Sequence, residues 1–235
     1  IRGITTKQCY LSGMSAVVTD IKKICNSEAI MYVVIAALLS AVVLALTMDS
    51  FLVPVFFLLS IGMAIVYNLG SNFISGEISF ITQALAAVLQ LAVTMDYSIF
   101  LWHSYQENLE KYDNDKERAM AHAISNTIVS VVGSSITTVA GFVAMCFMTF
   151  TLGLDLGVVM AKGVILGVIG CVTILPSMIL VFDKAIQKTK HKAIIPDLGK
   201  IGNFVTKKYV GFIVLFLVIL GPAVYGYTHN DVYYD

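Results

Sequence analysis

The sequence predicts an all-α integral membrane protein, and three observations lead to that fold class. Of the 235 residues, 58% are hydrophobic and only 13% are charged, whereas about a quarter of the residues in an average soluble domain are charged. The mean hydropathy is +0.85. Six apolar stretches are long enough to cross a bilayer, which needs about 20 helical residues. Fifteen basic residues balance fifteen acidic ones, so the basic excess typical of a nucleic-acid-binding protein is absent and no nucleic-acid partner is expected.

The six stretches have almost no charged residues. We expect membrane-spanning helices at residues 29–47, 51–70, 80–103, 126–150, 154–182 and 209–228. Among these, only the third and the fifth contain Asp, Glu, Lys or Arg, namely Asp96, Asp155 and Lys162. The sequence therefore predicts a six-helix transmembrane bundle in which three ionisable side chains need an explanation.

The links between the spans predict how the chain crosses the membrane. Residues 183–208 carry seven lysines and residues 104–125 carry three basic residues, whereas residues 71–79 and 151–153 carry none. Because short cytoplasmic loops are rich in Lys and Arg, we expect the two basic links to be cytoplasmic. The N-terminal segment and the C-terminal end are then extracytoplasmic.

The two ends of the chain suggest a longer protein. We expect residues 1–28 to be the end of a folded α+β extracytoplasmic domain, with a strand from Lys7 to Met14 and a helix capped by Ser15. Residues 229–235 resemble the start of a second such domain. Between them we expect a five-span bundle at 29–182, a basic linker at 183–208 and a sixth span at 209–228.

The cytoplasmic link 104–125 has helix signals at both of its ends. Glu107 and Lys111 are spaced i,i+4, which suits an ion pair on one helix face. Asp113 to Asp115 offers N-cap residues for a helix that continues through Ala119 and Ala123 into the fourth span. We expect a solvated helical connector.

Asp96 is the main functional candidate. A carboxylate deep in a span costs about 2.5–3.5 kcal/mol of insertion free energy, whereas a Leu, Ile, Val or Phe returns about 0.3–0.6 kcal/mol. Intramembrane acids usually face a bundle interior or a wet cavity and mark proton or ion pathways. We expect Asp96 to be enclosed by neighbouring helices and to carry protons, with the adjacent Tyr97 shaping its hydrogen bonding. A structural acid held by a helix hydroxyl or by Lys162 is the alternative.

Four further residues are candidates for supporting roles. His103 lies two turns from Asp96 on the same expected helix face and extends a path toward the cytoplasm, or else marks the membrane interface. Ser134 and Thr137 belong to a stretch of small and hydroxylated residues, and both are potential hydrogen-bond partners of Asp96. Glycines in that stretch predict close helix approach. Lys162 needs a partner, and both Asp155 and Asp96 are candidates.

Soluble-enzyme motifs are absent from the sequence. There is no Walker lysine loop, no GxSxG and no HExxH, and the four cysteines have no CxxC spacing. We expect a protein that is not an enzyme and that needs no cofactor or metal.

Four motifs in a fixed order resemble one family of membrane proteins. They are the intramembrane Met95–Leu101 (MDYSIFL), Ala119–Ala123 (AMAHA), Gly133–Phe142 (GSSITTVAGF), and a glycine-rich span that ends in Leu175-Pro176. This set is similar to the MMPL-type transporters of the resistance–nodulation–division (RND) superfamily. Residues from about 10 to the end then correspond to spans two to seven of a twelve-span fold.

The resemblance implies a function and a set of partners. Transporters of this type use the proton gradient across the bacterial plasma membrane to export lipids or other hydrophobic compounds, including drugs. Asp96 and Tyr97 match an Asp-Tyr proton-relay pair, and a second pair lies in the other half of the protein, which is missing here. The implied partners are protons, a hydrophobic substrate, membrane lipids and that second half, while the oligomeric state is left open.

Two other functions fit the same superfamily. A block of five spans also serves as a sterol- or lipid-sensing regulatory domain. A protein-translocation accessory of the SecDF kind also couples protons through this fold. The sequence downstream of residue 235 discriminates between a pump and a sensing domain.

Overall fold

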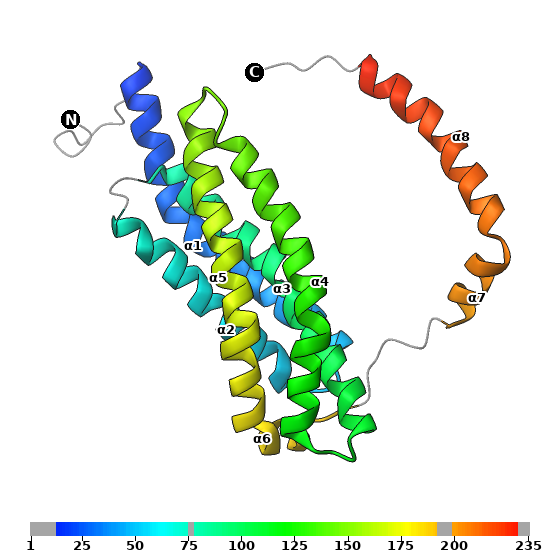
Figure 1. The fold of residues 1–235 in the computed structure, drawn as a ribbon. Coiled ribbons are helices and arrows are strands. Elements are labelled where there is room, and N and C mark those ends of the chain that lie inside the picture. Colours follow the sequence, from blue (N-terminus) through cyan, green and yellow to red (C-terminus); the bar gives the residue numbers. More distant parts are fainter. Residues whose placement is uncertain (1–12, 75–77, 192–198, 230–235) are drawn as a thin grey trace. The chain divides into compact units, whose positions relative to one another are not determined.

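The computed structural model describes residues 13–74, 78–191 and 199–229, and its regular structure there is helical (Figure 1). The chain divides into two compact units, residues 1–193 and 194–235. The first unit contains α1 (Met14–Thr47), α2 (Leu52–Gly70), the 3-10 turn η1 (Ser71–Ile74), α3 (Phe80–Lys111), α4 (Lys116–Met145), α5 (Thr151–Val181) and α6 (Asp183–Lys188). The second unit contains α7 (Gly199–Lys207) and α8 (Tyr209–Thr228).

Six of these helices are long and apolar enough to cross a membrane: α1, α2 with η1, α3, α4, α5 and α8. Each of them overlaps one of the six predicted spans, although α1, α3 and α4 extend beyond the predicted bounds. The prediction of an all-α membrane bundle is therefore confirmed, since apolar runs of this length form helices in a bilayer to satisfy their own backbone hydrogen bonds.

The connector between α3 and α4 has the predicted helix signals. The Lys111 ammonium donates to Glu107 Oε1 at 2.8 Å, and the Asp115 carboxylate caps α4 by accepting from the backbone N–H of Arg118 at 3.1 Å. Between the helices, Asp113 and Asn114 have φ angles of 48° and 66°, which Asn and Asp tolerate better than most residues. These signals are confirmed.

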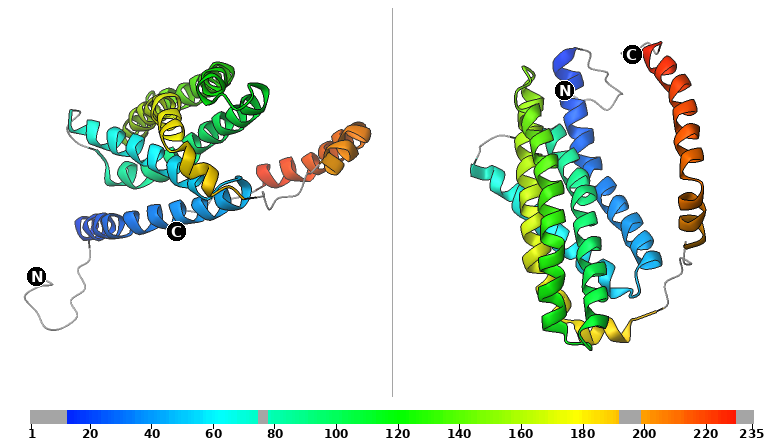
Figure 2. Two further views of the ribbon diagram at one scale, coloured as in Figure 1. Left: turned by 90° about the horizontal axis from the view of Figure 1, so that it is seen from below. Right: turned by 45° about the vertical axis from the view of Figure 1, so that its right-hand side comes forward.

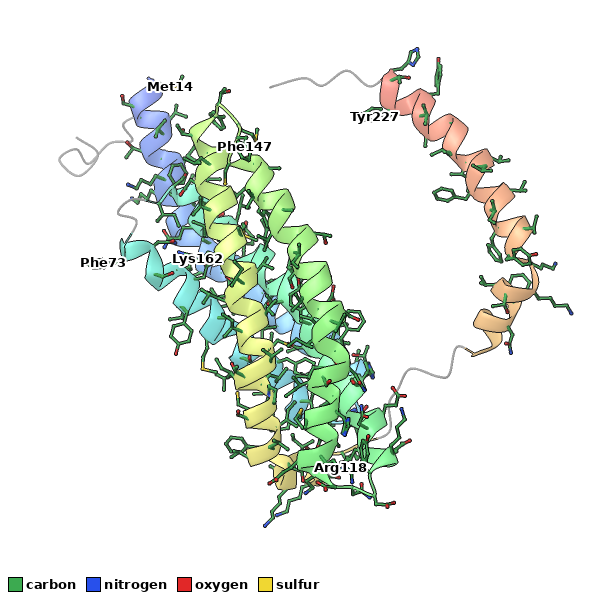
Figure 3. All side chains as sticks on the ribbon, viewed as in Figure 1. Met14, Phe73, Arg118, Phe147, Lys162 and Tyr227 are labelled. Carbon is green, nitrogen blue, oxygen red and sulfur yellow. The ribbon has the colours of Figure 1, made fainter. Side chains whose placement is uncertain are left out.

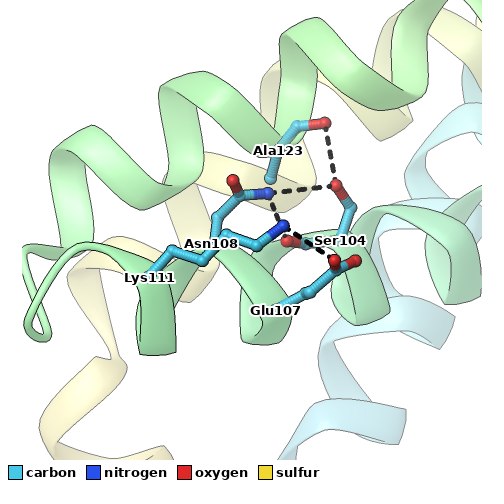
Figure 4. A network of polar contacts seen from close by, with 5 residues as sticks. All are labelled: Ser104, Glu107, Asn108, Lys111 and Ala123. Atoms are coloured by element: carbon cyan, nitrogen blue, oxygen red, sulfur yellow. Dashed lines mark hydrogen bonds and ion pairs between the residues drawn. The ribbon is translucent and has the colours of Figure 1, made fainter.

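At the same end, a side-chain hydrogen bond joins α3 to α4, and others lie within α3 (Figure 4). The Ser104 hydroxyl on α3 donates to the carbonyl of Ala123 on α4 at 3.5 Å. The Asn108 amide donates to the carbonyl of Ser104 at 2.7 Å. The Ser104 hydroxyl thus connects the two helices, while Asn108 bonds within α3 beside it.

The N-terminal helix differs from the expectation. We expected a cap at Ser15 and a separate helix before the first span, but α1 begins at Met14 after Gly13 (φ 128°) and continues unbroken to Thr47. No Gly or Pro interrupts residues 14–47, so no residue there stops the helix. The strand expected from Lys7 to Met14 falls mostly outside the described residues, and Met14 itself is helical.

Helix α3 is the centre of the first unit, since it packs against α1, α2, α4 and α5. Its side chains Leu101 and Tyr105 are fully buried, together with Phe57 of α2 and Leu175 of α5. The views in Figures 1 and 2 agree that α4 and α5 lie side by side along their length, and Figure 3 shows their side chains.

Glycines set the close approach of α5 to its neighbours. A Cβ atom at Gly157 would lie 2.5 Å from the Phe142 carbonyl oxygen of α4, and one at Gly167 would lie 2.1 Å from Thr94 Cγ2 of α3. Small residues permit such contacts, and in a bilayer, where lipid tails are as apolar as the side chains, this packing holds helices together.

The turn between α1 and α2 is attached to the segment after α6. The backbone N–H of His191 donates to the Asp49 carbonyl at 2.8 Å, and the hydroxyls of Ser50 and Thr189 are 2.7 Å apart. An ion pair joins Lys116 at the start of α4 to Asp183 at the start of α6. The start of the predicted basic linker is therefore folded onto this end of the bundle.

In the second unit, α7 and α8 follow one another closely. The Phe204 and Phe212 rings make an edge-to-face contact with centroids 5.8 Å apart. The side chains of α8 are exposed, as expected for an apolar helix that is surrounded by lipid or by other spans.

Candidate functional site

The Asp96 side chain lies near the middle of α3 on an exposed face of that helix. The residues of this exposed stripe recur every three or four positions, which is the period of one helix face. They are Leu85, Leu89, Ala92, Asp96, Phe100 and His103. The sequence pattern had placed Asp96 and His103 on one helix face, and the structure agrees.

The next residue, Tyr97, is buried, in contrast to the exposed Asp96. Its side chain is only 4% exposed and belongs to the main apolar core. The Asp-Tyr pair therefore has one member on the uncovered face and one member that anchors α3 within the bundle.

The enclosure expected for Asp96 is not provided by the described residues of this chain. Within residues 13–74, 78–191 and 199–229, the carboxylate makes no hydrogen bond or ion pair. The side chains of α1 and α4 do not cover the stripe. Asp96 by itself is thus a carboxylate in a membrane span whose face remains open.

The hydrogen bonds expected from Ser134 and Thr137 to Asp96 are not present among the described residues. The Ser134 hydroxyl donates to the carbonyl of Val131 at 3.1 Å, and the Thr137 hydroxyl donates to the carbonyl of Ser134 at 2.7 Å. Such bonds to the preceding turn satisfy a hydroxyl inside a span without any second helix.

The small and hydroxylated face of α4 is exposed like the stripe on α3. Ser130, Gly133, Ser134, Thr137 and Gly141 are all exposed. A Cβ atom at Gly133 or Gly141 would meet nothing within 4 Å. The close helix approach predicted for these glycines is absent among the described helices, so the face is available to another helix.

His103 shares the exposed stripe with Asp96. It lies seven residues further along α3, which is about 10 Å at 1.5 Å per residue. The helix face that a relay requires is therefore present. At this separation the two side chains need a proton-carrying group between them, and that group has to come from outside the described residues.

Lys162 has neither of its expected partners. Its ammonium donates to Oδ1 of Asn72 on η1, while the Asp155 carboxylate accepts from the backbone N–H of Ser79 at 2.8 Å. Asp96 lies on a different face of the bundle. The sequence did not predict Asn72 as the partner because it falls outside the predicted spans.

A buried polar clasp was missed by the sequence interpretation. The Asn68 amide on α2 donates to Gln90 Oε1 on α3 at 2.8 Å, and Gln90 Nε2 donates to the Gly163 carbonyl on α5 at 3.1 Å. Two amide side chains inside predicted spans were a signal for it, since polar groups in spans bond across helices.

Taken together, these positions define a class of protein. The chain is a multi-pass α-helical membrane protein, with an ionisable residue midway along its central helix and polar residues on two uncovered helix faces. It belongs to the MMPL family, which matches residues 4–206.

Curated relatives agree with that class. The chain is 26% identical over 182 residues to the membrane protein ActII-3 of Streptomyces coelicolor, covering 74% of this chain and 25% of the relative. It is 22% identical over 193 residues to the membrane protein YdfJ of Bacillus subtilis, covering 80% and 26%. It is 30% identical over 99 residues to the membrane protein MJ1562 of Methanocaldococcus jannaschii, covering 42% and 25%. The chain spans about a quarter of the length of these relatives.

Proposed function

We propose that the full-length protein is a secondary transporter, not an enzyme, that uses the proton gradient to export lipids or other hydrophobic compounds. In this proposal Asp96 takes up and releases the transported proton, and Tyr97 fixes the orientation of α3 beside it. Membership of the MMPL family supports a transporter of this general kind.

The observation that carries the proposal is the position of Asp96. An ionised carboxylate is expensive in contact with lipid, yet its stripe on α3 is left uncovered by the described helices. Relatives about four times as long as the matched region have further chain that is able to cover it. A carboxylate at such an interface gains and loses its proton as the covering helices move, which couples protonation to conformation.

The proposal includes an orientation in the bacterial plasma membrane. The end of the bundle that contains the α3–α4 connector and α6 carries Lys111, Lys116 and Lys184. By the positive-inside rule this end is cytoplasmic. The link at residues 71–79 and the α4–α5 turn are then extracytoplasmic.

Replacing Asp96 with Asn in the full-length protein tests this function. Asn has nearly the same shape but does not titrate, so we expect proton-driven export to fall to background while membrane insertion is unchanged. Export is followed in proteoliposomes with an imposed pH gradient, using a fluorescent phospholipid and ethidium as probes.

Glu107→Gln is the matched control, because it makes the same chemical change further along α3, on an exposed side chain that pairs with Lys111. We expect this variant to export normally. Proton-driven export by Asp96→Asn at the wild-type rate contradicts the proposal.

A further inference from the structure

Within the part of the chain that the structure describes, Lys162 brings a positive charge without a counter-charge into a membrane span. Its ammonium has three N–H donors, and its recorded partner is Oδ1 of the neutral Asn72 side chain. No carboxylate pairs with it within the described ranges 13–74, 78–191 and 199–229. In a membrane, a cation without a counter-charge attracts an anion more strongly than it does in water.

The Asn72 side chain leaves a second donor beside this charge. Asn72 is only 6% exposed, and its Nδ2 group has no hydrogen-bond partner among the described residues. Because Oδ1 of the same amide receives the lysine, the free N–H groups and the free ammonium donors lie close together. What both groups lack is an acceptor, and one that carries negative charge satisfies both.

This donor pair lies on the side of the bundle away from Asp96. Gln90 and Thr94 of α3 face Gly163 and Gly167 of α5. Asp96 follows Thr94 by about 200° around the helix. Helices that cover the Asp96 stripe therefore do not cover the Lys162 side of α5.

Asn72 brings the site to the end of the second span. Lys162 lies eleven residues after the start of α5, about 17 Å along that helix, and its ammonium reaches Asn72 on η1, where the second span ends. Beside it η1 ends at Ile74, and the Phe73 side chain is 92% exposed (Figure 3). The apolar stem of a lysine lies along apolar surface while its charged end reaches toward the polar interface.

We propose that the Lys162 ammonium and the Asn72 amide form a binding site for the anionic oxygen of a membrane amphiphile. The shared ligand chemistry is a phosphate diester or a carboxylate at the end of acyl chains. One oxygen accepts from Lys162 Nζ and the same group accepts from Asn72 Nδ2, while the acyl chains lie along the exposed apolar surface of α5. This site is separate from Asp96 and does not depend on export.

Native mass spectrometry of the full-length protein in neutral detergent tests this site. The anionic probe is phosphatidylglycerol, and the neutral probe is diacylglycerol with the same chains. We expect phosphatidylglycerol to bind with an affinity that Lys162→Met weakens about tenfold or more, because a hydrogen bond to a charged group is lost. Asn72→Ala weakens it less, Lys162→Arg retains it, and diacylglycerol binding is the same in all variants.

Lys111→Met is the matched lysine control, since Lys111 lies in α3 and is paired with Glu107. We expect wild-type binding of phosphatidylglycerol by this variant. Unchanged binding by both Lys162→Met and Asn72→Ala overturns the proposal. So does binding of inorganic phosphate as tight as that of the lipid, because the site is then one for a free anion. A loss of stability in Lys162→Met with no change in lipid binding also overturns it, since a carboxylate elsewhere in the protein then neutralises the lysine.

Discussion

The Asn68 side chain on α2 donates a hydrogen bond to Oε1 of Gln90 on α3 at 2.8 Å, and both side chains are completely buried. Gln90 Nε2 in turn donates a hydrogen bond to the Gly163 carbonyl of α5 at 3.1 Å. Three helices are therefore joined by two amides that are fully buried between them. This clasp fixes the side of α3 that faces α2 and α5, and thereby the direction in which Asp96 points.

Removing the clasp tests how much it stabilises the bundle. We expect Gln90→Leu to lower the free energy of unfolding by about 1–3 kcal/mol, because it leaves the buried Asn68 amide without its acceptor. The double variant Asn68→Leu/Gln90→Leu is expected to lose less than the sum of the single variants, with a coupling of about 0.6 kcal/mol and at most about 1.7 kcal/mol. Unfolding in a detergent–denaturant titration measures both values. Strict additivity contradicts a direct bond.

The contact between Gly167 and Thr94 predicts a steric effect. A methyl group at position 167 lies 2.1 Å from Thr94 Cγ2, so Gly167→Ala forces the helices apart and costs about 1–3 kcal/mol of unfolding free energy. Adding Thr94→Ser removes the clashing methyl group but keeps the hydroxyl, which donates to the Gln90 carbonyl at 2.7 Å. We therefore expect the double variant to recover most of the loss in the same titration.

Gly62→Ala is the control for that experiment, because a Cβ atom at Gly62 meets nothing within 4 Å. Alanine favours a helix over glycine by up to about 1 kcal/mol, so this variant is expected to be as stable as the wild type or slightly more so. Equal destabilisation by Gly62→Ala and Gly167→Ala would mean that backbone effects, and not the Thr94 contact, dominate.

The sequence predicted the spans well because length and apolarity alone define them in a bilayer. It also predicted the cap at Asp115 and the helix face that holds Asp96, since both depend on local spacing. It did not predict the partner of Lys162, because Asn72 is 90 residues away and a single sequence does not show which helices are neighbours. The sequence did not predict that Asp96 is uncovered, for the same reason. A residue pattern identifies a helix face but not what packs against it.

The ion pair between Lys116 and Asp183 predicts that removal of Lys116 lowers stability more than removal of Lys111. Asp183 is 4% exposed, so Lys116→Met leaves a nearly buried carboxylate without its partner. We expect a loss of about 1–2 kcal/mol of unfolding free energy, less than for a fully buried pair because the Lys116 side chain is 41% exposed. Lys111→Met removes a lysine from a pair that is exposed on both sides, and no measurable change is expected. The reverse order in thermal unfolding would show that the α4–α6 contact contributes little.

The open face of α4 predicts that the size of the side chain at position 133 affects transport but not membrane insertion. A Cβ atom at Gly133 has nothing within 4 Å, and the exposed position leaves Gly133→Leu room to point away from the described helices. If further helices of the full-length protein pack on this small face, the larger side chain keeps them away and export falls strongly while the amount of membrane-inserted protein is unchanged. Gly62→Leu, an equally unobstructed position on α2, is expected to export normally. Normal export by Gly133→Leu would instead assign this face of α4 to lipid, and the cover for Asp96 would have to come from the side of α1.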